Sequence, residues 1–350
     1  MDAFTTQQTV ELCSRIGTKK SHTRLDKLFI NACMTGPLLG FACAIVVSVN
    51  ASPWYQENAP GLIRLLGALL FPIGLVMIVL TSADLFTSNI MFCTLALLHR
   101  RISVLEYGKV LFVSFFGNLA GMLFFMAIVT GYGGVFEETP GYKQAAITIA
   151  VQKAVQPAWH HIFLRAIGAN WLVCLAVFMS ISARDIGSKI IAIWWPTATF
   201  VALALDHVVA NMYFIPNAIF VGAPAPLTTS YYIWKSLIPT TLGNYVAGSL
   251  FVALPYWYLY LTGEGGVDIA FNTGSLESAV REGAGPMGPS SHRASEATAV
   301  LEGQAVDSEE WRSRDWLPHS AGHLQSNLAK ELSMEKCGVD EKEPQNQSAV

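Results

Sequence analysis

The sequence contains six long, mainly apolar runs, and their lengths constrain the fold more than any other feature. They cover residues 28–50, 61–98, 108–132, 159–182, 189–222 and 236–262. A helix of about 20 mainly apolar residues is long enough to cross the hydrocarbon core of a bilayer. Only 13% of the 350 residues are charged and 52% are hydrophobic, whereas about 25% of the residues in a soluble domain are charged. The sequence therefore predicts an all-α membrane protein with six transmembrane helices per protomer.

Polar residues interrupt the second and the fifth run, which are too long for one crossing. The stretch TSADLFTSNIMF places Asp84 in the second run, and LALDHVVANMYF places Asp206 beside His207 in the fifth. Irregular backbone survives at membrane depth only where protein or a water-filled cavity satisfies its polar groups. We therefore expect two broken helices, each made of two half-helices joined by a short non-helical stretch.

Both broken helices follow one pattern. FPIGLVMIVLTSADLFTSN starts at Phe71 and WPTATFVALALDHVVAN starts at Trp195, and both run from a proline through an aspartate to an asparagine. Three runs precede the polar middle of the chain and three follow it, so the halves would enter the membrane in opposite senses, as in an inverted 3+3 repeat. We interpret the aspartates as N-caps of the second half-helices, and Asn89 and Asn211 as partners of freed backbone groups.

Lysine and arginine in the connections indicate the orientation, because short cytoplasmic loops carry an excess of both. They are frequent in residues 1–27 and in the connections after the second and fourth runs, and sparse in the alternate connections. Both termini are therefore predicted to be cytoplasmic. Residues 263–350 are rich in Gly, Ser, Ala and Glu, a composition that cannot bury enough apolar surface to fold. The predicted division is a cytoplasmic segment at 1–27, a pore domain at 28–262 and a disordered cytoplasmic tail at 263–350.

Several classes of function are disfavoured. A net charge of -3 offers no basic surface for nucleic acid. The apolar composition makes membrane lipid the expected surrounding. The six cysteines have no CxxC spacing and predict neither a disulfide framework nor a metal site. The runs contain no HExxH motif and no nucleophile with a neighbouring base, which argues against an enzyme and predicts no cofactor. A transport protein is favoured. A channel for water or glycerol is the second class, but the sequence lacks a paired Asn-Pro-Ala signature.

Three stretches resemble the formate/nitrite transporter family. They are FPIGL with ADLFTSN, then NWLVCLAVFMSISARDIGSKIIAIW, and then DHVVANMYFIP; the resemblance covers about residues 25–262. It implies an aquaporin-like homopentamer in which each protomer has its own pore.

The resemblance also implies roles for particular residues. The matched positions are Phe71, Leu75 and Phe200 at apolar constrictions, Leu85, Phe86 and Thr87 in the loop that breaks the second helix, His207 at the pore centre with Asn170 beside it, and Lys153 before the fourth run. In the DH pair, an aspartate stands where many relatives carry a glutamate, which keeps the charge but shortens its reach.

A small monovalent anion explains why such residues suit a pore. A charge at the centre of a membrane helix costs about 2.5 to 3.5 kcal/mol on insertion scales, and each half-helix N-terminus returns about 0.3 to 2 kcal/mol. Protonating an anion whose acid has a pKa of about 4 costs about 4 kcal/mol at neutral pH, so passage as a neutral acid is also open. The hypothesis is that His207 either attracts the anion as imidazolium or passes it a proton, while Thr87 and Asn170 orient the ring and bind the passing oxygens.

The substrate is a small weak-acid anion on this interpretation. The long tail and ISARDIGSKIIAIWWP resemble the fungal branch of the family, whose members are linked to nitrite uptake in nitrate assimilation. The resemblance therefore implies nitrite first and formate second, carried across the plasma membrane. Passive and proton-coupled transport both remain open.

Overall fold

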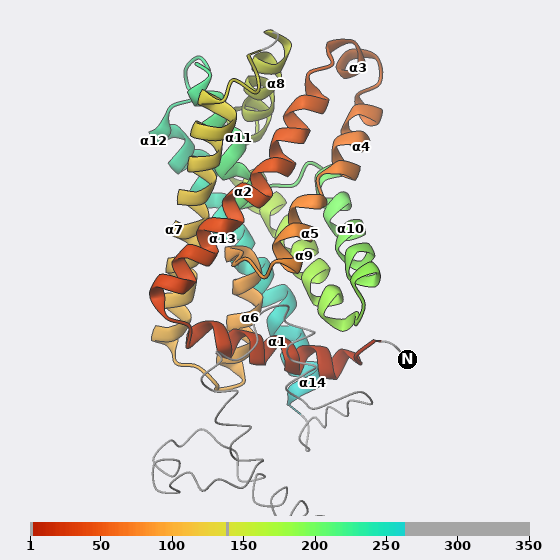
Figure 1. The fold of residues 1–350 in the computed structure, drawn as a ribbon, viewed down its shortest axis with the longest axis vertical. Helices are drawn as coiled ribbons and strands as arrows, with labels where there is room; N and C mark the ends of the chain where they lie inside the picture. Colours follow the sequence, from red (N-terminus) through yellow and green to blue (C-terminus); the bar gives the residue numbers. More distant parts are fainter. Residues whose placement is uncertain (1–2, 138–139, 263–350) are drawn as a thin grey trace, which may run out of the picture. The chain divides into compact units, whose positions relative to one another are not determined.

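In a computed structural model the described residues, 3–137 and 140–262, fold entirely as helices apart from their connections (Figure 1). The α-helices are α1 (Thr6–Ser21), α2 (Leu25–Asn50), α3 (Pro53–Asn58), α4 (Pro60–Leu70), α5 (Ile73–Leu80), α6 (Phe86–Leu98), α7 (Val104–Phe124), α8 (Pro140–Ala150), α9 (Trp159–Ser182), α10 (Ile186–Ala202), α11 (Val208–Phe220), α12 (Thr229–Tyr232), α13 (Ile238–Val246) and α14 (Leu254–Leu261). The π-helices are η1 (Phe125–Tyr132), η2 (Val151–Val155), η3 (Ile233–Leu237) and η4 (Ala247–Ala253).

Five helical segments in the described part of the chain are long and apolar enough to cross a membrane. They are Leu25–Asn50, Pro60–Leu80, Val104–Tyr132, Trp159–Ser182 and Thr229–Leu261. Three further apolar helices, α6, α10 and α11, are shorter. Large apolar side chains are exposed along the outside of these helices, among them Phe41, Leu66, Phe112, Trp195 and Leu250. So much exposed apolar surface suits lipid or another protein chain and not water.

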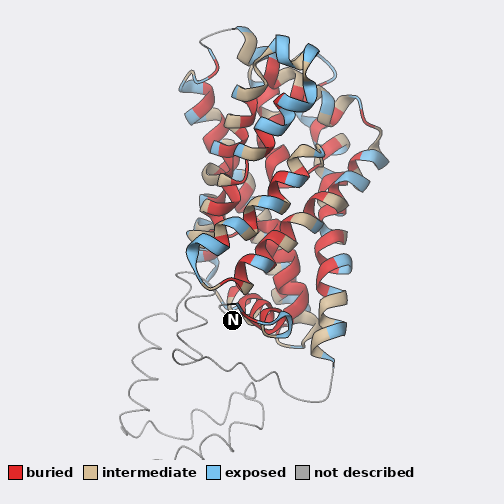
Figure 2. Ribbon diagram, turned by 90° about the vertical axis from the view of Figure 1, so that its right-hand side faces the viewer, coloured by how far each residue is buried: buried red, intermediate tan, exposed pale blue. Residues whose placement is uncertain are grey.

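The chain leaves the helical conformation where the sequence places its polar interruptions. The second apolar run forms α4, α5 and α6, with residues 81–85 outside any helix. The fifth run forms α10 and α11, with residues 203–207 outside. Figure 2 shows buried residues along the inner sides of the helices. Each interruption begins at an exposed residue and ends buried: Leu203 is 62% exposed, whereas Asp84 is 3% and Asp206 is 0% exposed.

Residues 1–27, which the sequence predicts only as a cytoplasmic segment, contain the helix α1. The helix begins with a capping box, in which Thr5 accepts from the Gln8 N–H and the Gln8 side chain accepts from the Thr5 N–H. Its apolar face buries Val10, Leu12 and Cys13. The helix lies across one end of the bundle and packs against α6, α9 and α14 (Figure 1). This segment is therefore a packed part of the helical unit.

Candidate functional site

The helices that precede the two interruptions end in the same way. Ser82 follows α5 and Ala204 follows α10, and both have left-handed backbone, with φ of 57° and 53°. The Ser82 N–H donates to the Val79 carbonyl, and the Ala204 N–H donates to the Val201 carbonyl. The N–H of the next residue donates to the carbonyl five positions back, from Ala83 to Ile78 and from Leu205 to Phe200. These bonds complete a Schellman motif at both helix ends. This motif turns the chain sharply out of the helix twice, at matching positions.

Each interruption is also held by an ion pair on a buried aspartate. Lys20 of α1 pairs with Asp84 Oδ1, and the Asn89 amide donates to the same oxygen at 3.2 Å. Lys153 of η2 lies 3.1 Å from Asp206 Oδ1, and the Asn211 amide donates to that oxygen at 3.3 Å. A buried carboxylate needs such partners because its desolvation is costly.

The prediction that the two aspartates cap the following helices is wrong. The N-caps are Leu85 for α6, without a side-chain cap bond, and His207 for α11. Each aspartate lies one residue before the N-cap, and its side chain turns to the lysine ammonium instead of to the helix N–H groups. The aspartates do tie down the interruptions, but through lysine and asparagine side chains. The same asparagines, Asn89 and Asn211, bind carboxylates where freed backbone groups were expected.

His207 is the centre of the best-defined polar cluster. Its Nδ1 accepts a hydrogen bond from the Ala210 N–H at 3.3 Å, and its Nε2 lies 2.9 Å from Thr87 Oγ1. Because a backbone N–H can only donate, we assign the neutral ring a proton on Nε2, which donates to Thr87. The Thr87 hydroxyl then keeps its own hydrogen free to donate. His207, Thr87 and Asn170 are at most 3% exposed.

Asn170 reaches the same cluster from α9. Its amide nitrogen donates to the Thr87 carbonyl at 3.3 Å and to the Asn244 carbonyl at 2.7 Å. The Cys174 thiol, one turn further along α9, lies 3.8 Å from the Thr87 carbonyl. Asn170 thus holds the backbone of Thr87, and its amide nitrogen is directed at carbonyls and not at the imidazole.

Aromatic rings pack on one side of the histidine. The ring centroids of Phe71 and Phe200 are 5.5 Å apart and nearly perpendicular, at 89°. The Phe200 ring centroid is 6.0 Å from that of His207. The Phe86 ring instead packs edge-on against Phe115 of α7, with centroids 5.2 Å apart.

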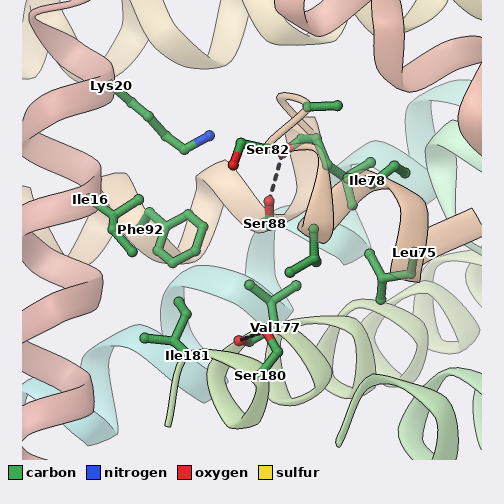
Figure 3. Close-up of a pocket in the computed structure, with 13 residues that line it drawn as sticks. Ile16, Lys20, Leu75, Ile78, Ser82, Ser88, Phe92, Val177, Ser180 and Ile181 are labelled. Atoms are coloured by element: carbon green, nitrogen blue, oxygen red, sulfur yellow. Dashed lines mark hydrogen bonds between the residues drawn. The ribbon is translucent and has the colours of Figure 1, made fainter. Parts of the chain in front are cut away.

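A cavity of about 60 Å³ lies between α1, α5, α6 and α9 (Figure 3). A cavity needs roughly 10 to 15 Å³ to hold one water, so this one has room for a few waters or a small ion. Leu75 and Leu85 border it, as do the Lys20 side chain and the hydroxyl-bearing Ser88 and Ser180. In Figure 3, Lys20 extends toward the cavity from α1, and Ser180 faces it from α9.

Sequence reasoning missed several of these residues. Lys20 and Asn31 bind Asp84 from positions 64 and 53 residues away in the chain. Asn118 and Asn244 bind the backbone around the interruptions. The signal for the last two was visible: each follows a glycine in the similar stretches GNLAG and GNYVAG, which otherwise suggest only close helix packing.

These observations define a class of protein: a helical membrane protein with a polar, titratable cluster buried at two helix interruptions. A family model described as formate/nitrite transporter matches residues 7–258. The chain therefore belongs to the formate/nitrite transporter family.

Relatives support this assignment over 69% to 74% of this chain. A probable formate transporter from Methanothermobacter thermautotrophicus is 36% identical over 269 residues, which is 72% of this chain and 96% of the relative. A formate-nitrite transporter from Plasmodium knowlesi is 29% identical over 267 residues, 74% of this chain and 84% of the relative. A yeast protein named uncharacterized transporter YHL008C is 32% identical over 247 residues, 69% of this chain but 38% of that longer protein.

Two solved structures share the fold. An FNT family ion channel matches with a TM-score of 0.66 and 26% identity, covering 72% of this chain and 98% of that one. A pentameric formate channel with formate bound matches with a TM-score of 0.60 and 31% identity, covering 68% of this chain and 98% of that one.

Proposed function

We propose that this protein conducts small monovalent weak-acid anions across the plasma membrane, with nitrite as the first candidate and formate as the second. The observation that carries the proposal is the buried His207–Thr87 hydrogen bond, formed where α6 and α11 begin. The positive ends of both helix dipoles lie at this point. One structural relative is described as a pentameric formate channel with formate bound, and this description is the support for formate as a candidate here. Nitrite rests on the resemblance of this sequence to the fungal branch.

The assembly proposed for this function is a homopentamer of protomers with six crossings each. The two halves of each protomer would form an inverted 3+3 repeat around the interruptions, in an aquaporin-like arrangement with both termini cytoplasmic. The duplicated contacts support the repeat, since Lys20, Asp84 and Asn89 correspond to Lys153, Asp206 and Asn211.

The proposed route runs from the cavity beside Lys20, past Leu75 and Leu85, to the His207–Thr87 pair. Leu75 and Leu85 exclude bulky or hydrated ions on one side of the His207–Thr87 pair. On the other side, Phe71 and Phe200 remove water from the anion. At the centre, the free Thr87 hydroxyl hydrogen donates to the anion while His207 Nε2–H polarises that hydroxyl. A cooperative donor of this kind offsets part of the desolvation cost.

Proton coupling is the finer part of the proposal. A second proton on His207 has to enter at Nδ1, the atom that accepts from Ala210 N–H. Charging the ring therefore opens the N-cap of α11, at a cost of about 0.5 to 2 kcal/mol for a lost cap. The ring acts as a hydrogen-bond donor when neutral, and it delivers a proton to the anion only when this cap is released.

The test is uptake by purified protein in liposomes that contain a pH-sensitive dye. Nitrite and formate should enter, and glycerol should not. Net acidification of the lumen during uptake supports co-transport of a proton, and an unchanged lumen supports passage of the bare anion. Uptake of glycerol without either anion would favour the neutral-solute channel and end this proposal.

His207→Ala and Thr87→Val test the central pair. Each removes one partner of the His207–Thr87 hydrogen bond, and His207→Ala also removes the acceptor of the Ala210 N–H. Thr87→Val should lower nitrite and formate flux about tenfold, the rate equivalent of a bond worth about 1.5 kcal/mol, and His207→Ala should lower it at least as much. His207→Ala should also change the pH dependence of flux. His160→Ala, at an exposed histidine that contacts His161, is the matched control. A pH profile of His207→Ala identical to that of the wild type would exclude a proton role for His207.

A further inference from the structure

Asn118 of α7 holds the first interruption by its backbone. Its Oδ1 accepts from the Phe86 N–H at 2.8 Å. Its Nδ2 donates to the Asp84 carbonyl at 2.7 Å and to the Ala32 carbonyl of α2 at 2.9 Å. The Asp84 carbonyl and the Phe86 N–H belong to the residues immediately before and after Leu85. One planar amide therefore fixes the backbone on both sides of Leu85 and ties it to α2.

Asn244 of α13 makes the same three bonds at the second interruption. Its Oδ1 accepts from the Val208 N–H at 2.8 Å. Its Nδ2 donates to the Asp206 carbonyl at 3.2 Å and to the Ala166 carbonyl of α9 at 2.7 Å. The residue enclosed here is His207. Asn118 and Asn244 are both 0% exposed.

Of the polar side chains as short as asparagine, only its amide can form all three hydrogen bonds. Each site needs one acceptor for a backbone N–H and two donated hydrogens for carbonyls, and an asparagine amide supplies both. A carboxylate has no hydrogen to donate, and a hydroxyl has only one. Losing the amide would leave one N–H and one carbonyl of each buried interruption without this partner, which proteins avoid. The Ala32 and Ala166 carbonyls lie inside α2 and α9 and keep their helical hydrogen bonds.

A glycine before each asparagine allows the close approach. A Cβ added at Gly117 would lie 2.5 Å from the Ala32 Cβ, and one added at Gly243 would lie 2.3 Å from the Phe163 carbonyl oxygen. Any side chain at these glycines would push the helices apart and lift the asparagine from its backbone partners. The shared Gly-Asn pair is thus explained by the asparagine as well as by helix packing.

The two enclosed residues differ in chemistry. Leu85 borders the cavity that Lys20 also lines, and it is 1% exposed. His207 bonds Thr87, and the Asn244 carbonyl also accepts from Asn170, the residue that holds the Thr87 carbonyl. Asn244 is therefore connected to both members of the His207–Thr87 pair, whereas Asn118 is connected to an apolar border of the cavity.

We infer that Asn118 and Asn244 are positioning residues with separate tasks: Asn118 sets the size of solute that passes Leu85, and Asn244 sets the hydrogen bonding of His207. This inference rests on the proposed function, in which both residues lie along the route. It assigns size selectivity and pH dependence to two asparagines that do not touch the solute.

The test compares Asn118→Ala and Asn244→Ala in the liposome assay. Two quantities are measured for each variant: the ratio of acetate flux to formate flux, and the pH profile of formate flux. Asn118→Ala should raise the ratio of acetate flux to formate flux about tenfold, which corresponds to the free energy of about one hydrogen bond that held the backbone beside Leu85. It should leave the pH profile unchanged. Asn244→Ala should shift the pH profile by about one unit, the equivalent of one lost hydrogen bond, and leave the ratio unchanged.

Matched controls lie one turn before each asparagine. Ser114→Ala removes a buried hydroxyl that bonds only its own helix, and Thr240→Val removes a buried hydroxyl without a partner among the described residues. Neither should change the ratio or the pH profile. If both asparagine variants changed the two quantities alike, or neither quantity moved, the separate tasks would be refuted.

A second measurement covers variants that fold poorly and separates this inference from the proposed function. The isosteric Asn118→Asp and Asn244→Asp keep the side-chain shape, and hydrogen exchange by mass spectrometry reads the backbone without transport. Exchange should rise at residues 84–86 only in the Asn118 variants and at residues 206–208 only in the Asn244 variants. A wild-type protein that carries no anion would overturn the proposed function, whereas exchange that rises equally at both segments would overturn the inference.

Discussion

At the scale of single residues, the site depends on buried polar groups that find partners far along the chain. His207 owes its tautomer to one backbone N–H, that of Ala210. Asp206 is 0% exposed, and its carboxylate depends on Lys153 from a different helix. Because desolvation of a charge is costly, removing the partner of such a buried group should destabilise the fold.

Lys153→Met tests this dependence. The substitution leaves the Asp206 carboxylate buried without its cation, and the loss should be about 3 to 5 kcal/mol of folding stability. Thermal unfolding in detergent measures it. Adding Asp206→Asn should recover most of the loss, because no buried charge then remains unpaired. Lys143→Met, at an exposed lysine of α8, should change little. A Lys153→Met protein as stable as the wild type would show that the ion pair does not hold the interruption.

At the scale of elements, α1 is fastened to the connection after α6 by a cluster of charges. Glu11 lies 2.6 Å from Arg15 and 2.7 Å from Arg101, and it is 3% exposed. His99 Nδ1 lies 3.6 Å from Glu11 and 3.2 Å from the Ser14 hydroxyl. The cluster joins a helix outside the membrane spans to the ends of α6 and α7.

The cluster predicts that acid loosens α1. Burial alone would raise the pKa of Glu11, but the hydrogen bonds and charges of Arg101 and Arg15 outweigh it and the pKa is lowered. Burial, followed by the Arg101 charge, lowers the pKa of His99. Both groups bind fewer protons when folded than when unfolded, so stability rises with pH. The His99 contribution is lost as pH falls below about 6.5, and that of Glu11 as pH falls below about 4.3.

Limited proteolysis of the N-terminal segment as a function of pH measures this effect. Cleavage should increase from neutral pH toward about pH 5 in the wild type, and the increase should vanish in His99→Gln. Glu11→Gln should be cleaved faster already at neutral pH, because Arg101 and Arg15 lose their shared carboxylate. His160→Gln, at an exposed histidine of α9, is the control. Equal cleavage of the wild type at both pH values would contradict the prediction.

At the scale of the whole molecule, the described helices carry an apolar outer surface and a polar interior at the interruptions. The outer surface includes exposed tryptophans and phenylalanines on α7, α9 and α10, for example Phe116, Phe124, Trp171 and Trp195. Such a surface requires lipid or neighbouring protomers. The expected tail, residues 263–350, lies outside the described residues.

Truncation after Thr262 tests the predicted division of the chain. The shortened protein should keep its assembly and its anion flux within about twofold of the full chain, since a segment with the composition of residues 263–350 adds little buried apolar surface. Light scattering of detergent-purified protein should give the mass of five protomers for both versions. Loss of assembly on truncation would show that the tail belongs to the folded unit.

Part of this fold and site follows from the sequence because its cause is local. Run lengths, the excess of lysine and arginine in alternate connections, and the aspartates at 84 and 206 all express hydrophobicity or charge over short windows. Those windows located both interruptions, and the family resemblance selected His207 and Thr87. They did not locate Lys20, which no local pattern marks. GNLAG and GNYVAG do mark Asn118 and Asn244, but a local window indicates only close helix packing there and not the backbone groups that the two asparagines bind.

The amino-acid sequence alone determined that this protein belongs in a membrane, where its helices are interrupted and which charges lie there. The tertiary structure decided which groups meet. Thr87 and His207 are 120 residues apart, and Asn118 reaches Asp84 across 34 residues. Hydrogen bonds are short and directional, so such partners are fixed only when packing of α2, α7, α9 and α13 brings distant segments within about 3 Å.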